Sequence, residues 1–497
     1  MSGLDVPAAL DASAVGQFSD DVDVVVIGFG IGGGCAAVSA AAAGARVLVL
    51  ERAAVAGGTT ALAGGHFYLG GGTAVQQATG HPDSAEEMYK YLVAMSRDPE
   101  HDKIRAYCED SVEHFNWLED LGIHFERSYY PEKAVIQPGT EGLMYTGNEK
   151  VWPFKDIAVP APRGHKVPVP GDTQGAAMVI DLLLKRAAEL GVQIRYETGV
   201  TNLVTEDGAV AGVAWKHFGD TGAARAKAVV IAAGGFVMNP QMVAEYTPKL
   251  AEKPFVLGNT YDDGLGIRLG VSAGGATRHM DQAFITAPAY PPAILLTGVI
   301  VNKLGRRFVA EDSYHSRTSG FVMDQPDSAA FLIVDEAHLQ RPEFPLIKFI
   351  DGWETVPEME ASLGIPEGNL VATLQRYNEF AARGEDPDFH KQPEFLAPQD
   401  TGPWAAFDLS LGKAMYSGFT VGGLATDVDG EVLDERGTPI PGLYAAGACA
   451  SNIAQDGKGY SSGTQLGEGS FFGRRAGSHA AAFANSAGPQ NNPAPPD

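Results

Sequence analysis

Runs of apolar residues, separated by glycine-rich turns, recur from one end of the chain to the other. Residues 22–27 form a continuous apolar run that is typical of a strand buried on both faces. An alanine-rich stretch follows as far as Gly44, where glycine ends the predicted helix. A second apolar run over 46–50 predicts a parallel strand beside the first. This strand–helix–strand order indicates a parallel α/β sheet.

Later segments extend the same architecture. Apolar residues at helical spacing predict two helices within 85–122 and one helix over 172–190. A β-hairpin is expected over 193–216 with residues 207–208 at its turn, and residues 227–232 return to the parallel sheet. We therefore expect a sheet with helices on both faces over about the first 280 residues.

The pattern changes in the middle of the chain. Aromatic and proline residues become more frequent there, and separate strands are expected over 293–302 and 329–335. The earlier glycine-rich style then returns. We expect three parts: a nucleotide-binding part over residues 1–280, an inserted cap domain over 281–405, and the second nucleotide-binding part over 406–497. A cleft between two such domains is a common place for a substrate.

Composition narrows the choice of partners. The 497 residues carry a net charge of −25, which argues against binding to nucleic acid or to an anionic membrane surface. No apolar stretch is long enough to span a membrane, and the acidic start of the chain lacks the pattern of a secretory signal. The three cysteines show no metal-binding spacing, so we expect no metal site and a cytoplasmic location. Polar and proline-rich composition predicts a disordered tail from about residue 485.

The turn between the strand predicted over 22–27 and the helix that follows carries a dinucleotide-binding fingerprint. Gly28, Gly30 and Gly33 fit G-x-G-x-x-G between the predicted strand and helix. These glycines allow a tight turn, close approach of a pyrophosphate, and close packing of helix on strand, while the helix N-terminus favours phosphate. Glu51 follows Gly33 by about 18 residues, where a carboxylate can accept hydrogen bonds from a ribose.

Three further segments favour FAD over a nicotinamide dinucleotide. A long loop over 53–72 is rich in glycine and threonine, and the segments 227–236 and 439–450 each combine a strand with small residues. Residues 459–477 then open a terminal helix, so the chain returns to its cofactor at both ends. No second fingerprint is visible. The residues that we expect to bind FAD are Gly28, Gly30, Gly33, Glu51, Arg52, Gly58, Thr59, Thr60, Ala63, Gly64, Gly65, Val200, Ala233, Gly234, Asp263, Gly447, Gly463, Thr464 and Leu466.

The order of these motifs resembles a known family. The strings GFGIGGG, GGTT, AAGG, GRRFVAE, GLYAAG and GRRAG occur in the order found in the flavoprotein family of fumarate reductases and 3-ketosteroid dehydrogenases, over nearly the whole chain. The resemblance implies an α/β fold: a Rossmann-like FAD-binding domain with an inserted α+β substrate (cap) domain. Succinate dehydrogenase relatives tether FAD through a histidine just before the position of Thr59. No histidine stands there in this chain, so non-covalent FAD is expected.

The departures from the family concern the substrate. Phe419 stands where fumarate reductases have the histidine of a His-Thr pair, and Arg317 is displaced from the position expected for the catalytic arginine. A dicarboxylate without these cations would leave buried charge unpaired, so we expect an uncharged, apolar substrate. Tyr314 in EDSYHS, with Tyr460 and Ser462 in GYSSG, is similar to the 3-ketosteroid dehydrogenases and most like their Δ4-(5α) members.

This resemblance implies the formation of a C4–C5 double bond in a 5α-3-ketosteroid, by loss of the C4 proton and transfer of the C5 hydride to flavin N5. Tyr460, with a backbone N–H from the turn over 463–467, would polarise the ketone, while Ser462 and Tyr314 would take the proton. Which residue is the terminal base stays open. So do Δ1 dehydrogenation, reduction of an enone or an unsaturated acid, and a flavoprotein without catalysis.

The remaining expectations concern Asp263, His66 and the electron acceptor. Asp263 is assigned to the cofactor or to the cap of the following helix, and both roles are compatible. His66 is expected to be structural. An external electron acceptor, a quinone or a carrier, is expected to reoxidise the flavin.

Overall fold

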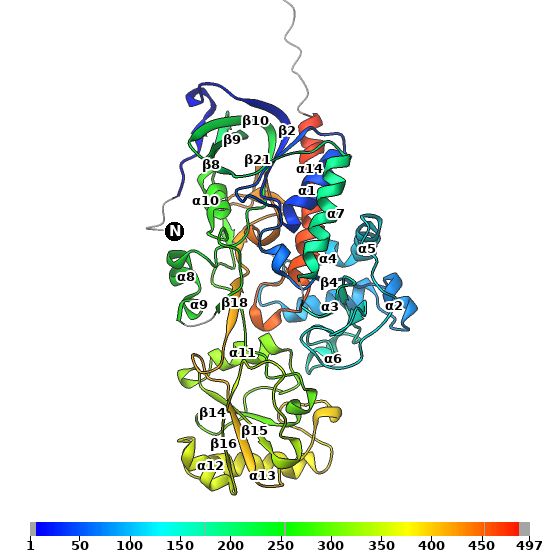
Figure 1. Ribbon diagram of the computed structural model, residues 1–497, viewed down its shortest axis with the longest axis vertical. Helices are drawn as coiled ribbons and strands as arrows, with labels where there is room; N and C mark the ends of the chain where they lie inside the picture. The colour runs from blue at the N-terminus through cyan, green and yellow to red at the C-terminus, as the bar shows by residue number, and fades with distance from the viewer. Residues whose placement is uncertain (1–5, 173, 253–254, 452, 487–497) are drawn as a thin grey trace, which may run out of the picture.

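A nine-stranded sheet forms the centre of the computed structural model, which describes residues 6–172, 174–252, 255–451 and 453–486. The strand order is β1-β8-β9-β10-β2-β3-β7, with β21 beside β10 and β20 beside β21 (Figure 1). The strands are β1 (Leu10–Asp11), β2 (Asp20–Ile27), β3 (Val47–Leu50), β7 (Gln193–Arg195), β8 (Thr198–Glu206), β9 (Ala209–His217), β10 (Asp220–Ile231), β20 (Glu431–Leu433) and β21 (Pro439–Ala445).

Strand β10 joins two kinds of pairing. Its first half is antiparallel to β9, while its second half is parallel to β2 and β21. The predicted turn at Asp207 and Gly208 is confirmed, since both have positive φ between β8 and β9. The predicted hairpin starts too early, however. Residues 193–195 form β7, which is parallel to β3, and the chain changes direction at Glu197, where φ is 53°.

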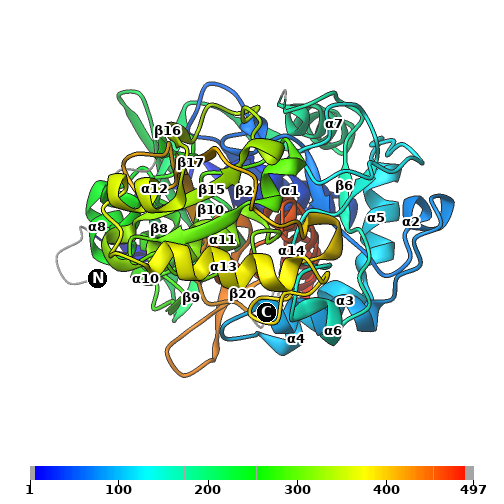
Figure 2. The same cartoon turned by 90° about the horizontal axis from the view of Figure 1, so that it is seen from below.

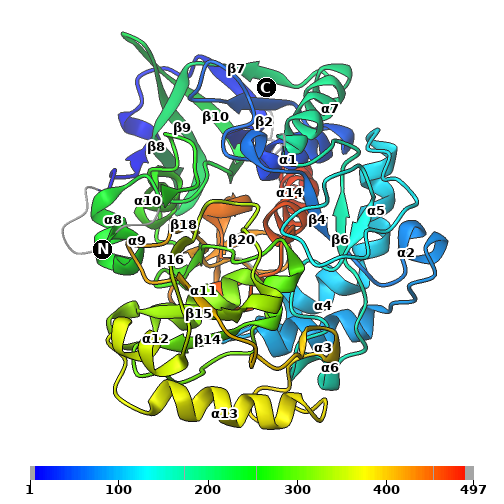
Figure 3. The same cartoon turned by 60° about the horizontal axis from the view of Figure 1, so that its bottom comes forward.

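One face of this sheet is covered by α1 (Ile31–Ala42), α7 (Gly175–Glu189) and α14 (Thr464–Ser486), as Figures 1 and 3 show. Two glycines let α14 approach α1: a Cβ on Gly473 or Gly477 would lie 2.5 or 2.1 Å from a backbone oxygen of α1. The parallel strands therefore lie beneath closely packed helices.

The other face departs from the expectation of helices on both faces. Apolar residues of β2 share a core there with Val200, Leu203 and Val213 of the β8–β9 hairpin and with Ile267 of the short helix α10 (Leu265–Ser272). Most of this face is thus covered by β-structure, because the hairpin folds back across it. The tail that was expected from about residue 485 lies almost entirely at 487–497, outside the described residues, and α14 itself continues to Ser486.

A helical lobe lies beside the sheet. Its second predicted helix is divided, because Asp110, with φ −94° and ψ 6°, interrupts it. The lobe consists of α2 (Ala74–Ala78), α3 (Ala85–Met95), α4 (His101–Glu109), α5 (Ser111–Asp120), α6 (Phe154–Ile157) and the small sheet of β4 (His66–Tyr68), β6 (Gly164–Lys166) and β5 (Leu143–Met144).

A four-stranded antiparallel sheet in the order β14-β15-β17-β16 lies at the opposite end of the molecule (Figures 1 and 2). Its strands and helices are β14 (Val299–Asn302), β15 (Ala330–Asp335), β16 (Lys348–Trp353), β17 (Trp404–Asp408), α11 (His315–Met323), α12 (Val356–Ser362) and α13 (Asn369–Ala381). The strand expected over 293–302 is only half right, because Ala293–Thr297 is a 3₁₀ helix that starts after Pro292. The exact boundaries of the cap domain stay a prediction.

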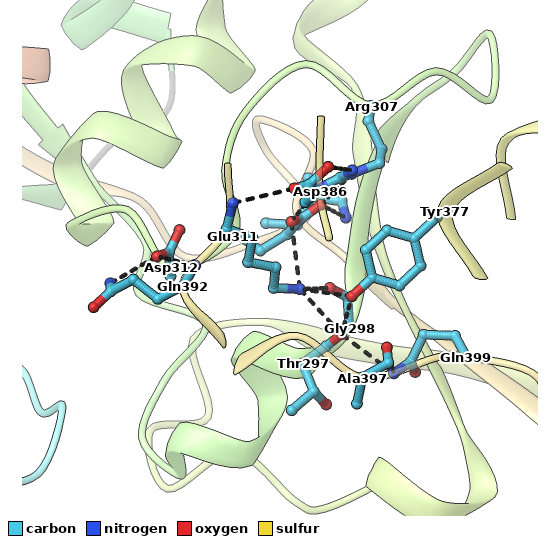
Figure 4. A network of polar contacts seen from close by, with 12 residues as sticks. Thr297, Gly298, Arg307, Glu311, Asp312, Tyr377, Asp386, Gln392, Ala397 and Gln399 are labelled. Atoms are coloured by element: carbon cyan, nitrogen blue, oxygen red, sulfur yellow. Dashed lines mark hydrogen bonds and ion pairs between the residues drawn. The ribbon is translucent and has the colours of Figure 1, made fainter. Parts of the chain in front are cut away.

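A buried ionic network lies beside this sheet (Figure 4). Arg307 forms paired hydrogen bonds with the carboxylates of Glu311 and Asp386, at 2.8–3.0 Å. The ammonium group of Lys391 donates to the carbonyls of Thr297 and Gly298. Burial alone would raise the pKa of Glu311, but the charges of Arg307 and Lys391 lower it. The second arginine of the GRRFVAE motif, Arg307, therefore forms structural ion pairs with Glu311 and Asp386.

Two short sheets connect the parts. They contain β11 (Phe255–Val256), β18 (Ser417–Thr420) and β13 (Ala283–Thr286), and β12 (Thr277–Arg278) with β19 (Gly423–Leu424). Helices α8 (Pro240–Tyr246) and α9 (Pro248–Glu252) lie near the first of them. Over the part of the chain that the structure describes, no helix is both long and apolar enough to cross a membrane.

Candidate active site and cofactor site

A cavity of about 930 Å³ runs from the turn between β2 and α1 to the cap domain. Its lining includes Gly28, Glu51 and Arg52 around the fingerprint, and Tyr314 and Phe344 from the middle of the chain. Every residue that we expected at the cofactor or the reacting centre lines this cavity, except Gly33 and Thr464.

The fingerprint glycines have distinct steric roles. Gly28 has φ +92°, and a Cβ there would lie 2.7 Å from the carbonyl oxygen of Ala232. A Cβ on Gly33 would lie 2.0 Å from the oxygen of Gly28, so Gly33 sets the contact between α1 and β2 from behind the cavity. Thr464 is also withdrawn, because its hydroxyl donates to the carbonyl of Ser461.

Glu51 is buried and fixes the loops around the fingerprint. One carboxylate oxygen accepts the N–H of Phe29 at 2.8 Å, and the other accepts the N–H of Ala53 at 2.8 Å. Each oxygen keeps a further lone pair for a ligand hydroxyl. Glu51 therefore joins the turn after β2 to the loop after β3 at the position where a ribose is expected.

Two threonines tie the loop over 58–65 to the rest of the site. Thr60 accepts the N–H of Ile31 at 3.0 Å, and Thr59 accepts the N–H of Asn259 at 2.8 Å while donating to the carboxylate of Asp262. Burial raises the pKa of Asp262.

Arg52 and Asp263 form an ion pair at 2.6 Å at the rim of the same region. Asp263 also accepts the N–H of Leu265, so it supports the start of α10 as well as lining the cavity.

The lining fits a dinucleotide with a large ring system. The N-cap residue of helix α1 is Gly30, which places no side chain in front of the first turn, and a helix N-terminus suits a phosphate group. At the far end Gly463, with φ +95°, packs so tightly that a Cβ would lie 2.8 Å from the backbone nitrogen of Tyr68. The fold thus keeps side chains out of both places where backbone must approach a cofactor.

The three residues expected at the reacting centre line the cavity and lie close together. Tyr314 and Tyr460 are buried, and Ser462 is half-buried. Burial raises the pKa of Tyr314 well above its usual value, with Tyr460 adding to the effect and the neighbouring Ser462 hydroxyl acting in the opposite direction. The hydroxyl of Tyr460 accepts the backbone N–H of Gln465 at 3.4 Å, and burial raises its pKa too.

An aromatic wall adjoins these groups. The rings of Phe284 and Phe419 stack at 4.7 Å, and Tyr460 meets Phe284 edge-on at 4.8 Å. Phe419 thus contributes an apolar ring to this wall.

Arg317 lies outside the cavity lining, between the rings of Phe154 and Phe321, and burial lowers its pKa. Among the described residues that line the cavity, Arg52 is the only lysine or arginine, and it is paired with Asp263.

Several lining residues carry no motif and were missed. Gln465 supplies the N–H to Tyr460, and the only signal for it was its place in the turn over 463–467. His315 follows Tyr314, and its Nδ1 lies 2.6 Å from the hydroxyl of Thr286; burial lowers the pKa of this histidine to about 3. His66, expected to be structural, also lines the cavity.

Comparisons with known proteins agree with this geometry. A model of the FAD binding domain family matches residues 23–469. The crystal structure of 3-ketosteroid Δ4-(5α)-dehydrogenase from Rhodococcus jostii, in complex with 4-androstene-3,17-dione, has 41% sequence identity and a TM-score of 0.90, and the match covers 95% of this chain and 99% of that chain.

Two curated proteins are also similar. The 3-oxo-5-alpha-steroid 4-dehydrogenase of Comamonas testosteroni is 29% identical over 87% of this chain and 93% of its own length. The vinyl phenol reductase of Lactiplantibacillus plantarum is 27% identical over 93% of this chain and 97% of its own length. The expected FAD cofactor and α/β fold are confirmed by these matches, and the protein is an FAD-dependent oxidoreductase. The chain belongs to the FAD binding domain family.

Proposed function

We propose that this protein oxidises an uncharged 3-ketosteroid and introduces a C4–C5 double bond into a 5α substrate. The observation that carries the proposal is that Tyr314, Tyr460 and Ser462 lie close together in the lining of one cavity. Among the described residues of that lining, Arg52 is the only lysine or arginine, and it is ion-paired. The Rhodococcus jostii relative, which holds a Δ4-3-ketosteroid, supports the same reaction class.

In this proposal FAD is held without a covalent bond. Glu51 would accept hydrogen bonds from the ribose, while the first turn of α1 and Thr59 and Thr60 would surround the pyrophosphate. Bound FAD would supply the oxidant for the hydride that leaves C5. Asp263 would act through Arg52, which its carboxylate orients at the rim.

Tyr460 would polarise the substrate ketone. Because its hydroxyl oxygen accepts the Gln465 N–H, its own hydrogen is available to donate. Burial raises the pKa of this phenol, so it remains a donor at neutral and alkaline pH. A donor at the carbonyl oxygen stabilises the negative charge that develops when the C4 proton is lost.

Tyr314 and the neighbouring Ser462 would remove the C4 proton as a pair of hydroxyl groups that act together. Serine alone is a poor base, and a buried phenol resists ionisation. A pair that shares the proton combines the access of the half-buried serine with the acidity of the phenol. The ketone at C3 acidifies the C4–H bond, which reduces the demand on this base.

Reduction of an activated double bond is the second candidate, because the vinyl phenol reductase is similar over nearly its whole length. The same phenol donors would serve that direction. Phe419 and Arg317 argue against an acidic substrate in either direction, since neither supplies a cation to the cavity. An external quinone or carrier would complete the oxidative cycle, and the buried free thiols agree with the proposed cytoplasmic location.

Anaerobic titration of the purified yellow protein tests the proposal. Addition of a 5α-3-ketosteroid should bleach the flavin absorbance, and mass spectrometry with NMR should identify the Δ4 product. A Δ1 product would correct the position of dehydrogenation. The result would favour the reductase instead if no ketosteroid bleaches the oxidised protein and an enone or a vinyl phenol reoxidises the reduced protein.

A further inference from the structure

His66 lies in the cavity lining together with Ser462 and Gly463. It is the first residue of β4 and is 6% exposed. A Cβ on Gly463 would lie 3.1 Å from the backbone carbon of His66, so the turn that carries Ser462 packs directly against it. The backbone of His66 therefore adjoins the turn that carries Ser462, both residues line the cavity, and the proposed mechanism gives the imidazole no task.

The neighbours of His66 fix the tautomer of its ring. The side-chain nitrogen of Gln137 donates to the backbone carbonyl of Glu141 at 2.8 Å, which directs the amide oxygen of Gln137 toward His66. That oxygen lies 2.6 Å from Nε2 of His66, and an amide oxygen can only accept a hydrogen bond. Nε2 must therefore carry the hydrogen.

The second ring nitrogen is then an acceptor. Burial, with smaller contributions from the charges of Lys166 and His165, lowers the pKa of His66 to about 4, so the ring is neutral at pH 7. A neutral imidazole has one N–H, and Nδ1 carries a lone pair. Among the residues that the structure describes, Nδ1 has no hydrogen-bond partner.

A donor from a ligand in the cavity would satisfy this nitrogen, for which the described residues supply no donor. A ketone offers only acceptor oxygens at the reacting end, so the substrate cannot supply the donor there; this step rests on the proposed function. The isoalloxazine ring of FAD does carry N–H groups, one at N3 in both redox states and one at N5 after reduction. We propose that Nδ1 of His66 accepts a hydrogen bond from an N–H group of this ring.

Binding and redox measurements on His66→Phe test the proposal without any substrate. Phenylalanine fills a similar space and removes the acceptor, and loss of one hydrogen bond should weaken FAD binding about fivefold. His114→Phe is the matched control, because His114 is equally buried and bonded to Ser470 but lies outside the cavity lining. That variant should bind FAD within about twofold of the parent protein. His66→Gln, which keeps an acceptor oxygen, should recover most of the affinity.

The midpoint potential separates the two sources of the donor. If the donor is N3–H, His66→Phe weakens the binding of oxidised and reduced FAD equally and leaves the potential unchanged. If it is N5–H, only reduced FAD loses affinity, and the potential falls by about 30 mV for each tenfold loss. A His66→Phe protein with parental FAD affinity for both redox states and parental potential would overturn the proposal.

Nitrogen-15 NMR of histidine-labelled parent protein gives a result that does not depend on the variant folding. Before FAD is added, Nδ1 of His66 should have the chemical shift of an unprotonated nitrogen, and FAD should move it toward that of a hydrogen-bonded one. A protonated Nδ1, or an unprotonated Nδ1 that FAD leaves unshifted, would refute the proposal. Steroid titration plays no part in these readouts, so failure of the proposed function would leave them interpretable.

Discussion

The hydroxyl oxygen of Tyr460 lies 3.4 Å from the backbone nitrogen of Gln465, in the first turn of α14. The contact occupies a lone pair of the phenol and leaves its hydrogen to point elsewhere. The same turn thus orients the donor and begins the helix that returns to the cofactor.

Replacing Tyr460 with phenylalanine should therefore slow flavin reduction by a 5α-3-ketosteroid. Removal of one preorganised donor to a developing oxyanion costs about 100-fold to 1000-fold in rate. Anaerobic stopped-flow measurement of flavin bleaching gives the rate, and FAD content should be unchanged. Tyr416→Phe is the control, because this buried hydroxyl bonds to Leu409 outside the cavity lining. A Tyr460→Phe protein with the parental rate would contradict the assignment.

Tyr314 and Ser462 should behave as one unit. Tyr314→Phe and Ser462→Ala should each lower the rate of flavin reduction by about 100-fold or more, because each breaks the shared proton path. The double variant should be little worse than either single one, as expected for coupled residues. Rapid-kinetic comparison of the four proteins measures the coupling, and strictly multiplicative losses would show that the two groups act separately.

The pH dependence of this pair has a defined sign. Burial raises the pKa of Tyr314, so the fraction of the pair that can accept a proton grows as the pH rises. The kcat/KM value of the parent should therefore increase from neutral pH with no plateau below about pH 10, the ordinary range of a phenol. Tyr314→Phe should flatten the residual profile. A plateau near neutral pH in the parent would point to another base.

Glu51→Gln should weaken FAD binding by about tenfold or more. A glutamine offers one oxygen and one NH₂ group, so either the Phe29 N–H or the Ala53 N–H would face another donor. The ribose would also lose a charged acceptor, and such hydrogen bonds contribute about 1.5–3 kcal/mol. Fluorescence titration of the stripped protein with FAD measures the change. Glu206→Gln is a control, because its contact with Arg225 lies at the surface.

The sequence indicates the cofactor half of this site far better than the substrate half. Gly28, Gly33 and Glu51 could be assigned because their spacing follows from the geometry of one strand, one turn and one helix. Phe284 and Thr286 reach the cavity through the pairing of β13 with β18, more than 100 residues later in the chain. No local pattern reports such a pairing.

The local sequence pattern also led to wrong predictions, of which two concern the bounds and type of an element. The helix expected to run through residue 110 breaks at Asp110, whose carboxylate binds Arg475 of α14. The strand expected from residue 293 is replaced at first by a 3₁₀ helix, since an apolar run is compatible with either structure. Both differences arise from tertiary contacts or from short-range ambiguity rather than from the apolar pattern itself.

The network around Arg307 provides a test of stability that is independent of chemistry. Its guanidinium group is almost fully buried and is bonded to Glu311 and Asp386, so Arg307→Met would leave two buried carboxylates without their main partner. Breaking a buried pair from one side costs about 3–5 kcal/mol. The free energy of unfolding, measured by denaturant titration of the holoprotein, should fall by that amount, while the residues of the cavity remain in place.

Acid should weaken the same ionic network in the parent protein, and the free energy of unfolding should report the loss. The pKa values of Glu311 and Asp386 are lowered in the folded state, because Arg307 outweighs the effect of their burial. Their contribution to stability is therefore complete above about pH 5 and is lost as the pH falls through the lowered values. In Arg307→Met the burial of these carboxylates is no longer offset by the guanidinium, so their pKa values should rise. The variant should then lose stability as the pH increases from about 5 to 7, where the parent is nearly constant, and parallel curves for the two proteins would show that the ion pairs contribute little.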